Sequence, residues 1–421
     1  MNNQPALEKS GLKVLLCDSS PNWGGQEYRL LREAQWLHER GHKVLVVCGA
    51  RSELALRLPR QAPGVQVEKM RSWGGLLGLL EFLWKVHRWS PDVIHAHSGQ
   101  DALWASIFHF FGRTVVCSRH MTVPSRMKGQ RKFCYRSGCS RVIASAEFIK
   151  RDLIAAVGIP ESSVDVVGEG VDLKEFHPEA NGRGFREEFG IPEDVLVFGI
   201  VAMIREEKGH AQFVKAAAKV RDQIPGARFV IVGDGQESRM EKLRRRVLKE
   251  FPLQPAPVIF TGYREDVPEI MAALDVLVVP SLREAQTLVI PQAFATGKPV
   301  IASLVGGIPE IVTHGRNGLM VTAGDVRDLA AAMVRLAESP DLRLRLGRAG
   351  LDLARQELLF DRKMELLLGS YRRAINRAPA GNQSPQASRD VWHGRSSADW
   401  LTAEQRQKKD VTRSPMLSRD R

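Results

Sequence analysis

Residues 276–321 read VLVVPSLREAQTLVIPQAFATGKPVIASLVGGIPEIVTHGRNGLMV, and this stretch decides the fold. Its opening, 276–280, is a short apolar run that ends in proline, which predicts a strand buried on both faces. A loop with Glu284 follows, and then a helix is expected over about 288–296, ended by Gly297 as a C-cap residue. Another buried strand follows that glycine. The order of strand, loop, helix and strand is typical of a parallel sheet with helical crossovers.

The start of this helix is predicted to hold an anion. Pro291 has no N–H donor and fits a helix only near its first turn, so Thr287 is the expected N-cap. The N–H groups of Leu288, Val289 and Ile290 would then point out of the carboxyl edge of the sheet. Because free N–H groups and the helix dipole favour negative charge, this edge suits a phosphate.

Length and composition allow two or three domains with sizeable cores, since the chain has 421 residues and is 43% hydrophobic. Three of the five cysteines, Cys17, Cys48 and Cys117, fall in or beside apolar runs and are expected as reduced core residues. The N-terminal segment has no signal-peptide pattern, and no apolar run reaches the roughly 20 residues that span a bilayer. We therefore expect a cytoplasmic protein.

The formal net charge of +13 favours an anionic partner, such as nucleic acid, a phospholipid surface or a lipid-linked phosphosugar. Residues 121–139 contain no acidic residue, and Phe133 and Tyr135 are interleaved with five basic side chains. Those five are Arg126, Lys128, Arg131, Lys132 and Arg136. Such a segment binds nucleic acid, lies on an anionic membrane or forms a solvated helix face, and charge alone leaves the three open.

Apolar runs alternate with helical stretches along most of the chain. Strands are expected at 12–17, 42–48, 91–97, 113–118, 141–145, 163–172, 195–201 and 228–237, and in the strand-and-loop segment 258–267. This alternation predicts parallel sheets, in which ligands bind at the carboxyl ends of the strands.

Several candidate site residues follow those strands. Gly24 and Gly25 let a backbone approach a ligand, although such a pair can also form an ordinary turn. His120 follows another strand, where a lone histidine is more often structural than catalytic. Arg205 and Lys208 follow the strand at 195–201, where two cations can neutralise a diphosphate or remain ordinary surface charges.

Together these motifs resemble retaining glycosyltransferase family 4 over roughly residues 12–375. The resemblance rests on P-S-x-x-E at 280–284, on the A-x-A-x-G-x-P-V-I-A-S-x-x-G-G-x-P-E-I-V run that ends at 312, and on R-x-x-K-G at 205–209. Gly-Gly-x-Glu at 24–27 and S-R-H at 118–120 add to it. The resemblance implies an α/β GT-B fold. Such a fold has two Rossmann-like domains with parallel sheets facing across a cleft, and a C-terminal helix that crosses back to the N-terminal domain.

The resemblance also implies roles for individual residues. Glu284 and His120 would lie beside the transferred sugar and act in catalysis. Gln292 stands where the family has a ribose-binding glutamate, so it keeps hydrogen bonding but not carboxylate strength. Donor binding is implied for nine residues: Arg205, Lys208, Thr287, Leu288, Gln292, Gly24, Gly25, Tyr263 and Arg264. Of these, the cations would hold the diphosphate, and the backbone of Tyr263 and Arg264 would contact the base.

The reaction implied is transfer of a sugar from a nucleoside diphosphate to a hydroxyl with retention, in lipopolysaccharide or other cell-surface glycan synthesis. No Asp-x-Asp motif occurs, so a metal is not expected, and the nucleotide sugar is a co-substrate rather than a cofactor. The basic segment is interpreted as facing a lipid-linked or glycan acceptor, or the inner face of the cytoplasmic membrane, rather than nucleic acid. Two alternatives stay open: an epimerase or hydrolase on the same fold, and a catalytically silent sugar-binding relative.

Four parts of the chain are expected from these landmarks. Residues 1–185 would form the acceptor-side domain and residues 186–360 the donor domain. Residues 361–378 would form the crossing helix, and the polar tail at 379–421 is predicted to be disordered.

Overall fold

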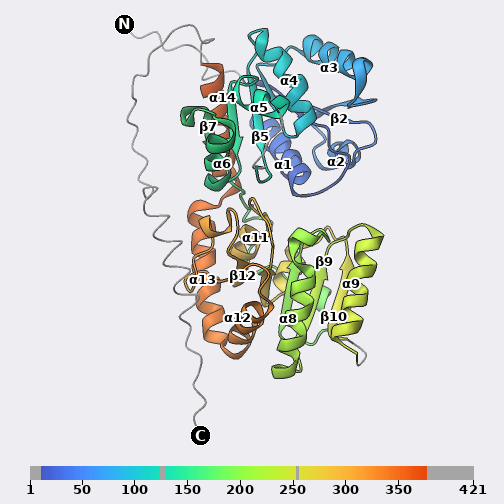
Figure 1. Cartoon of the computed structure of the whole chain (residues 1–421), viewed down its shortest axis with the longest axis vertical. Helices are drawn as coiled ribbons and strands as arrows, with labels where there is room; N and C mark the ends of the chain where they lie inside the picture. The colour runs from blue at the N-terminus through green and yellow to red at the C-terminus, as the bar shows by residue number, and fades with distance from the viewer. Residues whose placement is uncertain (1–10, 124–128, 253–255, 377–421) are drawn as a thin grey trace.

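The computed structural model describes residues 11–123, 129–252 and 256–376. Two lobes lie one above the other, and each is built on one parallel sheet with helices packed against it (Figure 1). The expected α/β fold with two Rossmann-like domains is therefore confirmed. Among the described residues, no helix is long and apolar enough to cross a membrane.

The first sheet has seven strands in the order β3-β2-β1-β4-β5-β6-β7. They are β1 Lys13–Asp18, β2 Lys43–Gly49, β3 Gln66–Met70, β4 Val93–Ala96, β5 Val115–Arg119, β6 Arg141–Ala144 and β7 Val164–Val166. The helices are α1 Gly25–Glu39, α2 Glu53–Gln61, α3 Gly75–Trp89, α4 Gly99–Phe110, α5 Gly129–Arg136 and α6 Glu147–Val157. In β1, Val14 and Leu16 pack into one core cluster and Leu15 and Cys17 into another. Both faces of this sheet are thus buried, which explains its continuous apolar strands.

The second sheet has six strands in the order β10-β9-β8-β11-β12-β13. They are β8 Val197–Val201, β9 Arg228–Val232, β10 Val258–Gly262, β11 Val276–Val279, β12 Val300–Ser303 and β13 Gly318–Val321. The helices of this lobe are α7 Arg183–Glu188, α8 His210–Gln223, α9 Glu237–Glu250, α10 Val267–Ala273, α11 Val289–Ala295, α12 Val326–Glu338 and α13 Pro340–Glu357. Strands β11 and β12 are buried along their whole length, and the stretch at 276–321 supplies three adjacent strands of this sheet, from β11 in the interior to β13 at the edge.

The last described helix, α14 (Phe360–Ile375), leaves the second lobe and packs on the first (Figure 1). Its Met364 and Tyr371 belong to a core cluster of the first sheet. At its start, the indole of Trp36 donates a hydrogen bond of 2.7 Å to Asp361 Oδ1. The predicted C-terminal crossing helix is therefore confirmed.

The structure corrects two local predictions and adds one strand that was not predicted. Strand β3 was not predicted because it is an edge strand with a half-exposed, polar sequence. The strand expected at 163–172 ends at Val166, after which the chain leaves the sheet. Helix α11 begins at Val289 with Leu288 at its N-cap position and no side-chain cap hydrogen bond, so the assignment of Thr287 as N-cap is wrong. Cys17, Cys48 and Cys117 are buried free thiols, as expected.

The division between the domains lies between β7 and β8. Phe185 of α7 is buried in the core of the second lobe, and Arg186 pairs with Asp275 there at 2.9 Å. The predicted boundary at residue 185 falls inside α7. The predicted tail at 379–421, and Arg126 and Lys128 of the basic segment, lie outside the described residues.

Candidate active site

Glu284 lies in the loop that follows β11, and its side chain is almost completely buried. Its Oε2 accepts a hydrogen bond of 2.6 Å from Lys208 Nζ and one of 3.2 Å from Ser281 Oγ. Lys208 Nζ and Glu284 therefore form an ion pair at the carboxyl ends of β8 and β11, two neighbouring strands. The sequence placed both residues in the site, and the structure brings them into direct contact.

Backbone contacts hold the loop after β8 and the loop after β11 together. The N–H of Leu282 donates to the carbonyl of Glu207 at 2.7 Å. Gly209 has a φ of +74°, and a Cβ at this position would lie 1.9 Å from the carbonyl oxygen of Pro280. Only glycine permits this close approach, so the glycine after Lys208 fixes that lysine beside Glu284.

A glycine pair in the loop after β12, Gly306 and Gly307, packs against the backbone of Glu284 and Ala285. Gly306 has a φ of +55°, and a Cβ there would lie 1.7 Å from the carbonyl oxygen of Glu284. The next residue, Gly307, donates its N–H to the carbonyl of Ala285 at 2.9 Å. The G-G of the quoted stretch thus has a structural role that the sequence did not assign, which is to pack against the backbone that carries the carboxylate.

Glu284 faces a pocket between the two domains, with a volume of about 590 Å³. The second domain lines it with Leu282, Arg283, Glu284, Val305 and Gly306, and the first domain with Thr122, Val123, Phe148 and Asp152. Burial raises the pKa of Asp152, while Arg151 opposes that rise. Of the described lining residues, Asp152 and Glu284 carry the carboxylates, and they come from opposite domains. Asp152 was missed because an isolated acidic residue on a helix carries no motif.

Arg205 is the N-cap residue of a short 3₁₀ helix, Glu206–Lys208, and its side chain is partly exposed. It pairs with Glu207 at 3.8 Å and lies 3.0 Å from the sulfur of Met203. The structure thus places both predicted cations in one loop, with Lys208 rather than Arg205 in contact with Glu284.

The glycine pair of the first domain meets the second domain. Gly24 is the N-cap of α1, and Gly25 is its first residue. A Cβ on Gly24 would lie 3.8 Å from the Met203 side chain, and one on Gly25 would lie 3.3 Å from that of Leu288. The start of α1 therefore lies against two loops of the second domain, and donor binding by Gly24 and Gly25 stays a prediction.

Gln292 lies one turn into α11 and is mostly buried. It borders a cavity of about 20 Å³, which is lined largely by charged and polar residues of both domains, among them Arg29, Arg32 and Glu169. The neighbouring Gln286, which the sequence did not single out, accepts a hydrogen bond of 2.5 Å from the N–H of Glu169. This loop therefore also connects the two domains.

Tyr263 and Arg264 lie after β10, at another contact between the domains. The Tyr263 side chain is half exposed, and the guanidinium of Arg57 from the first domain lies 5.4 Å from its ring. Arg264 forms ion pairs with Glu188 and Asp266, both at 2.6 Å. The structure gives neither residue a contact with Glu284, so their proposed role in contacting the base stays a prediction.

His120 belongs to a buried histidine network. Its Nε2 lies 3.3 Å from Nδ1 of His97, and the two rings are almost parallel. Burial lowers the pKa of both histidines well below the usual range. His120 thus contacts His97 rather than Glu284, and Thr122, two residues later, lines the interdomain pocket.

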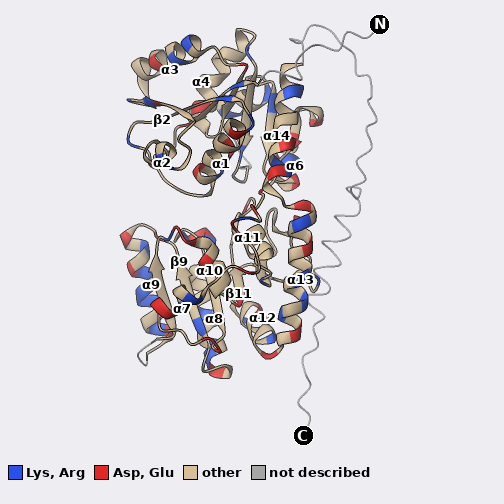
Figure 2. Ribbon diagram, turned by 180° about the vertical axis from the view of Figure 1, so that it is seen from behind, with Lys and Arg blue, Asp and Glu red and all other residues tan. Residues whose placement is uncertain are grey.

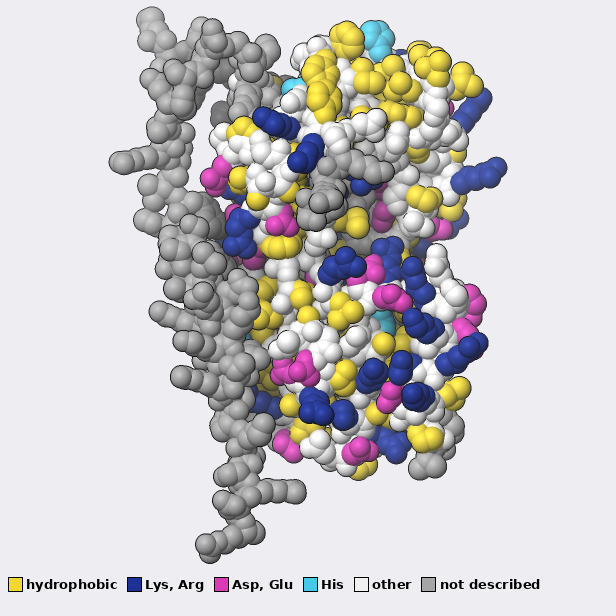
Figure 3. Space-filling view, in the orientation of Figure 1, with side chains coloured by type: hydrophobic (Ala, Val, Ile, Leu, Met, Phe, Trp, Pro, Cys, Tyr) yellow, Lys and Arg dark blue, Asp and Glu magenta, His cyan; other side chains and the backbone are white. Residues whose placement is uncertain are grey.

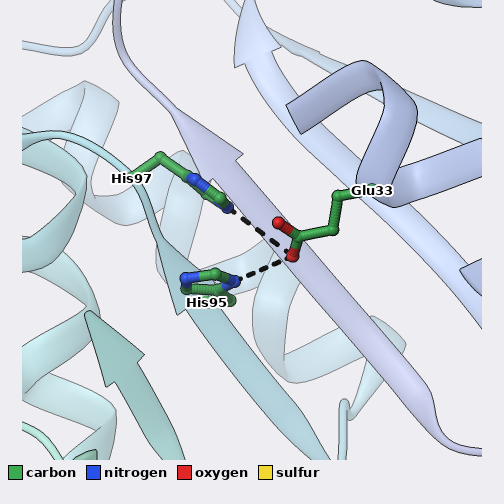
Figure 4. A group of neighbouring side chains, drawn as sticks. All are labelled: Glu33, His95 and His97. Carbon is green, nitrogen blue, oxygen red and sulfur yellow. Dashed lines mark hydrogen bonds and ion pairs between the residues drawn. The ribbon is translucent and has the colours of Figure 1, made fainter. Parts of the chain in front are cut away.

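Glu33 of α1 completes this network, and its role was not predicted from the sequence. Figure 4 shows Glu33 directed toward His95 and His97, and its Oε1 lies 3.0 Å from Nδ1 of His95 and 4.0 Å from Nε2 of His97. Tyr371 of α14 donates to the same oxygen at 2.6 Å. Burial opposes a negative charge on Glu33, but the two histidines and the tyrosine outweigh this effect and lower its pKa to about 2.

The ligand atoms of Glu33, His95 and His97 lie within 4.8 Å of one another, a spacing that could hold a metal ion. Two of these residues already use their polar atoms internally, since His95 also lies 2.7 Å from Ser118 Oγ and Glu33 accepts from Tyr371. The arrangement therefore serves as a hydrogen-bond network that ties the crossing helix to the first sheet.

In the basic segment, Arg131 and Arg136 are exposed on α5, and Lys132 is partly buried. Phe133 is exposed, but Tyr135 is buried in the core of the first domain. Tyr135 therefore belongs to the core and is unavailable to stack on a nucleic-acid base. Figure 2 shows Lys and Arg on elements of both domains, so the positive charge is not confined to this segment.

Comparison with known proteins gives the class to which this fold and site belong. Residues 194–339 match the family model described as Glycosyl transferases group 1, and residues 23–175 match the model described as Glycosyltransferase Family 4. The chain is therefore a glycosyltransferase of the GT-B type. The match to the family 4 model lies in the first lobe, and the match to the group 1 model lies in the second.

Individual relatives agree with this class. D-inositol 3-phosphate glycosyltransferase of Pseudarthrobacter chlorophenolicus is 27% identical over 395 residues, which cover 84% of this chain and 91% of that protein. Sulfoquinovosyl transferase SQD2 of Arabidopsis thaliana is 28% identical over 377 residues, covering 82% of this chain and 70% of the relative. The structure of Anabaena Alr3699/HepE in complex with UDP and glucose has a TM-score of 0.77 at 23% identity, and the alignment covers 85% of this chain and 99% of that one. This last likeness shows a shared fold.

Proposed function

We propose that this protein transfers a sugar from a nucleoside diphosphate sugar to a hydroxyl acceptor, with retention at the anomeric carbon. The observation that carries the proposal is the contact of 2.6 Å between Lys208 and Glu284 at the wall of the interdomain pocket. A cation at this place would bind the diphosphate, and the carboxylate would lie beside the sugar that the diphosphate carries.

These positions support the proposed reaction. The bond between the anomeric carbon and the diphosphate oxygen breaks, and the acceptor oxygen bonds to the same face of that carbon, while the acceptor's proton passes to the departing diphosphate. Negative charge grows on the diphosphate as it leaves, so Lys208 and Arg205 would stabilise the transition state more than the bound substrate. Glu284 would stabilise the positive charge that develops on the sugar ring. Closure of the two domains would exclude water and favour transfer over hydrolysis.

The first-domain wall would hold the acceptor. Asp152 lines the pocket from the first domain and can accept a hydrogen bond from an acceptor hydroxyl. We propose a lipid-linked or glycan acceptor, as in the synthesis of lipopolysaccharide or another cell-surface glycan, used at the inner face of the cytoplasmic membrane. Of the two comparison relatives, one is named a D-inositol 3-phosphate glycosyltransferase and the other a sulfoquinovosyl transferase, so the test includes both glycan and lipid acceptors.

A panel of nucleotide sugars tests the proposal. The protein is incubated with each sugar, with and without a mixture of glycan and lipid acceptors, and release of the nucleoside diphosphate is measured. Acceptor-dependent release that is lost in Glu284→Gln supports transfer. Release or isomerisation without acceptor would indicate the hydrolase or epimerase alternative, and nucleotide binding without turnover would indicate a silent relative.

Two further measurements test the finer parts of the proposal. Proton NMR of the first product formed gives the anomeric configuration, and an inverted product would refute retention. Turnover in the presence of EDTA tests the expectation that no metal is needed, and activity restored only by a divalent cation would refute it.

A further inference from the structure

Helix α3 turns a row of large apolar side chains away from the protein. Leu77 is 83% exposed, Leu76 is 70% exposed, and Leu80 and Trp84 are each more than half exposed. Their positions recur about every four residues, so they share one side of the helix. Phe82 and Val86 on the opposite side are buried in the core of the first domain. The helix is therefore anchored by one face and leaves a second apolar face without a partner among the described residues.

A second apolar group lies on the neighbouring helices. Phe110 ends α4, Phe111 follows it, and both are exposed. Phe133 of α5 stacks on Phe110 with ring centroids 5.5 Å apart. Figure 3 shows hydrophobic side chains gathered over the top of the molecule, the end at which Figure 1 places α3 and α4. An apolar surface of this kind on a water-exposed domain marks an interaction site.

The margin of this surface is basic. The exposed side chains of Arg71, Arg88, Arg113 and Arg136 come from the same helices and the loops beside them. The guanidinium of Arg88 lies 4.7 Å from the Trp84 ring, which brings a cation to the edge of the apolar face. The nearby carboxylate of Glu68 is already paired with Lys85 at 2.6 Å and with Arg88 at 2.7 Å. The arginines can contact the anionic headgroups of a bilayer, and the leucine, tryptophan and phenylalanine side chains that they surround can enter its acyl layer.

We propose that this surface, the outer face of α3 together with Phe110, Phe111 and Phe133, docks the protein on an anionic lipid bilayer. A second copy of the chain fits less well, because it would bring two basic margins together. Docking of this kind is a property of the first domain and does not depend on the transfer reaction. It would hold the acceptor-side domain at the surface where a lipid-linked acceptor is found.

Vesicle flotation of the full chain, without any nucleotide sugar, tests the proposal. The probes are vesicles of phosphatidylcholine alone and vesicles of phosphatidylcholine and phosphatidylglycerol in equal parts. We expect binding to the mixed vesicles that weakens as salt rises, because the arginine contribution is screened. The double variant Leu77→Gln with Leu80→Gln should bind at least about tenfold less, since it removes the apolar contact.

The chain offers a matched control. Leu248 on α9 and Leu344 on α13 are each 59% exposed but lie on the second domain. Replacing both by glutamine should leave vesicle binding unchanged. Trp84 supplies a direct readout, because vesicles with brominated acyl chains should quench its fluorescence, measured as the difference from Trp84→Phe.

Three results would overturn the proposal. One is equal vesicle binding by the α3 double variant and the wild-type chain, with both folded by circular dichroism. Another is an equal loss in the control variant. The third is a change from dimer to monomer in light scattering of the α3 variant with vesicle binding unaffected, which would assign the surface to a second copy of the chain.

Discussion

Replacing Lys208 by alanine removes the cation that contacts Glu284 Oε2 at 2.6 Å. A hydrogen bond that involves a charged group contributes about 1.5 to 3 kcal/mol. Because the Lys208 side chain is 26% exposed, water screens part of its charge, and we expect the lower part of that range, about 1.5 to 2 kcal/mol. At about 1.4 kcal/mol for each factor of ten, turnover should fall about 10- to 30-fold.

The assay is release of the nucleoside diphosphate at saturating donor, with the nucleotide sugar that the panel identifies. Titration calorimetry with the nucleoside diphosphate alone gives the ground-state part of the effect, which should be smaller than the loss in turnover. Lys242→Ala is a matched control, because Lys242 is an exposed lysine of the same domain that pairs with Glu206 at 3.0 Å. It should leave both measurements unchanged.

A loss of folding could imitate this result, since Lys208→Ala leaves the buried Glu284 with Ser281 as its remaining hydrogen-bond partner. Urea unfolding separates the two effects, and the added change Glu284→Gln removes the unpaired charge. The double variant should regain stability but not turnover. If folded Lys208→Ala keeps wild-type turnover and wild-type affinity for the diphosphate, the reasoning about this cation is refuted.

Three other predictions concern Gly306, Asp152 and Asp18. Gly306→Ala should lower turnover on the order of a hundredfold, because its Cβ would lie 1.7 Å from the carbonyl oxygen of Glu284 and displace that residue. Gly315→Ala is the control, because Gly315 also has a positive φ but open space around it, and the variant should lose only stability, by about 1 to 2 kcal/mol. Equal turnover in the Gly306 and Gly315 variants would contradict the predicted displacement of Glu284. Asp152→Asn should raise the KM for the acceptor alone, whereas a change confined to the donor KM in initial-rate measurements would place Asp152 on the donor side. Asp18→Asn should stabilise the protein more at pH 8 than at pH 4 in urea unfolding, and an equal effect at both values would count against it.

The sign of the Asp18 prediction follows from its surroundings. Burial, together with Asp101 and Glu27, raises the pKa of Asp18 to about 8. The unfolded chain releases this proton above about pH 4, while the folded protein keeps it until about pH 8. The folded state therefore binds more protons in this interval, and the free energy of unfolding falls as pH rises through it. Asparagine does not ionise and therefore avoids this loss of unfolding free energy at higher pH. Its side-chain oxygen can still accept a hydrogen bond from the N–H of Ser20, which lies 3.1 Å away in the wild-type protein.

Much of the fold could be predicted from local sequence. Strands β1, β2, β8 and β11 are buried on both faces, and such strands must be continuously apolar whatever their neighbours are. Strand β3 could not be predicted in the same way, because an edge strand that is partly solvated has no apolar run. The cap of α11 was also misassigned, since a favourable residue type does not fix where the chain turns into the helix.

The sequence by itself determined the α/β class and the strand ends that carry Lys208 and Glu284, while the glycines that let those loops approach each other were recognised only in the structure. The class and the strand ends follow from periodicity and residue type, which act over a few neighbouring residues. Only the tertiary structure decided that Lys208 and Glu284 are 2.6 Å apart, that Asp152 lines the same pocket from the other domain and that Glu33 connects two histidines to Tyr371. Contacts between residues so far apart in the chain depend on how the strands are ordered and how the crossing helix packs, and no local pattern encodes that order.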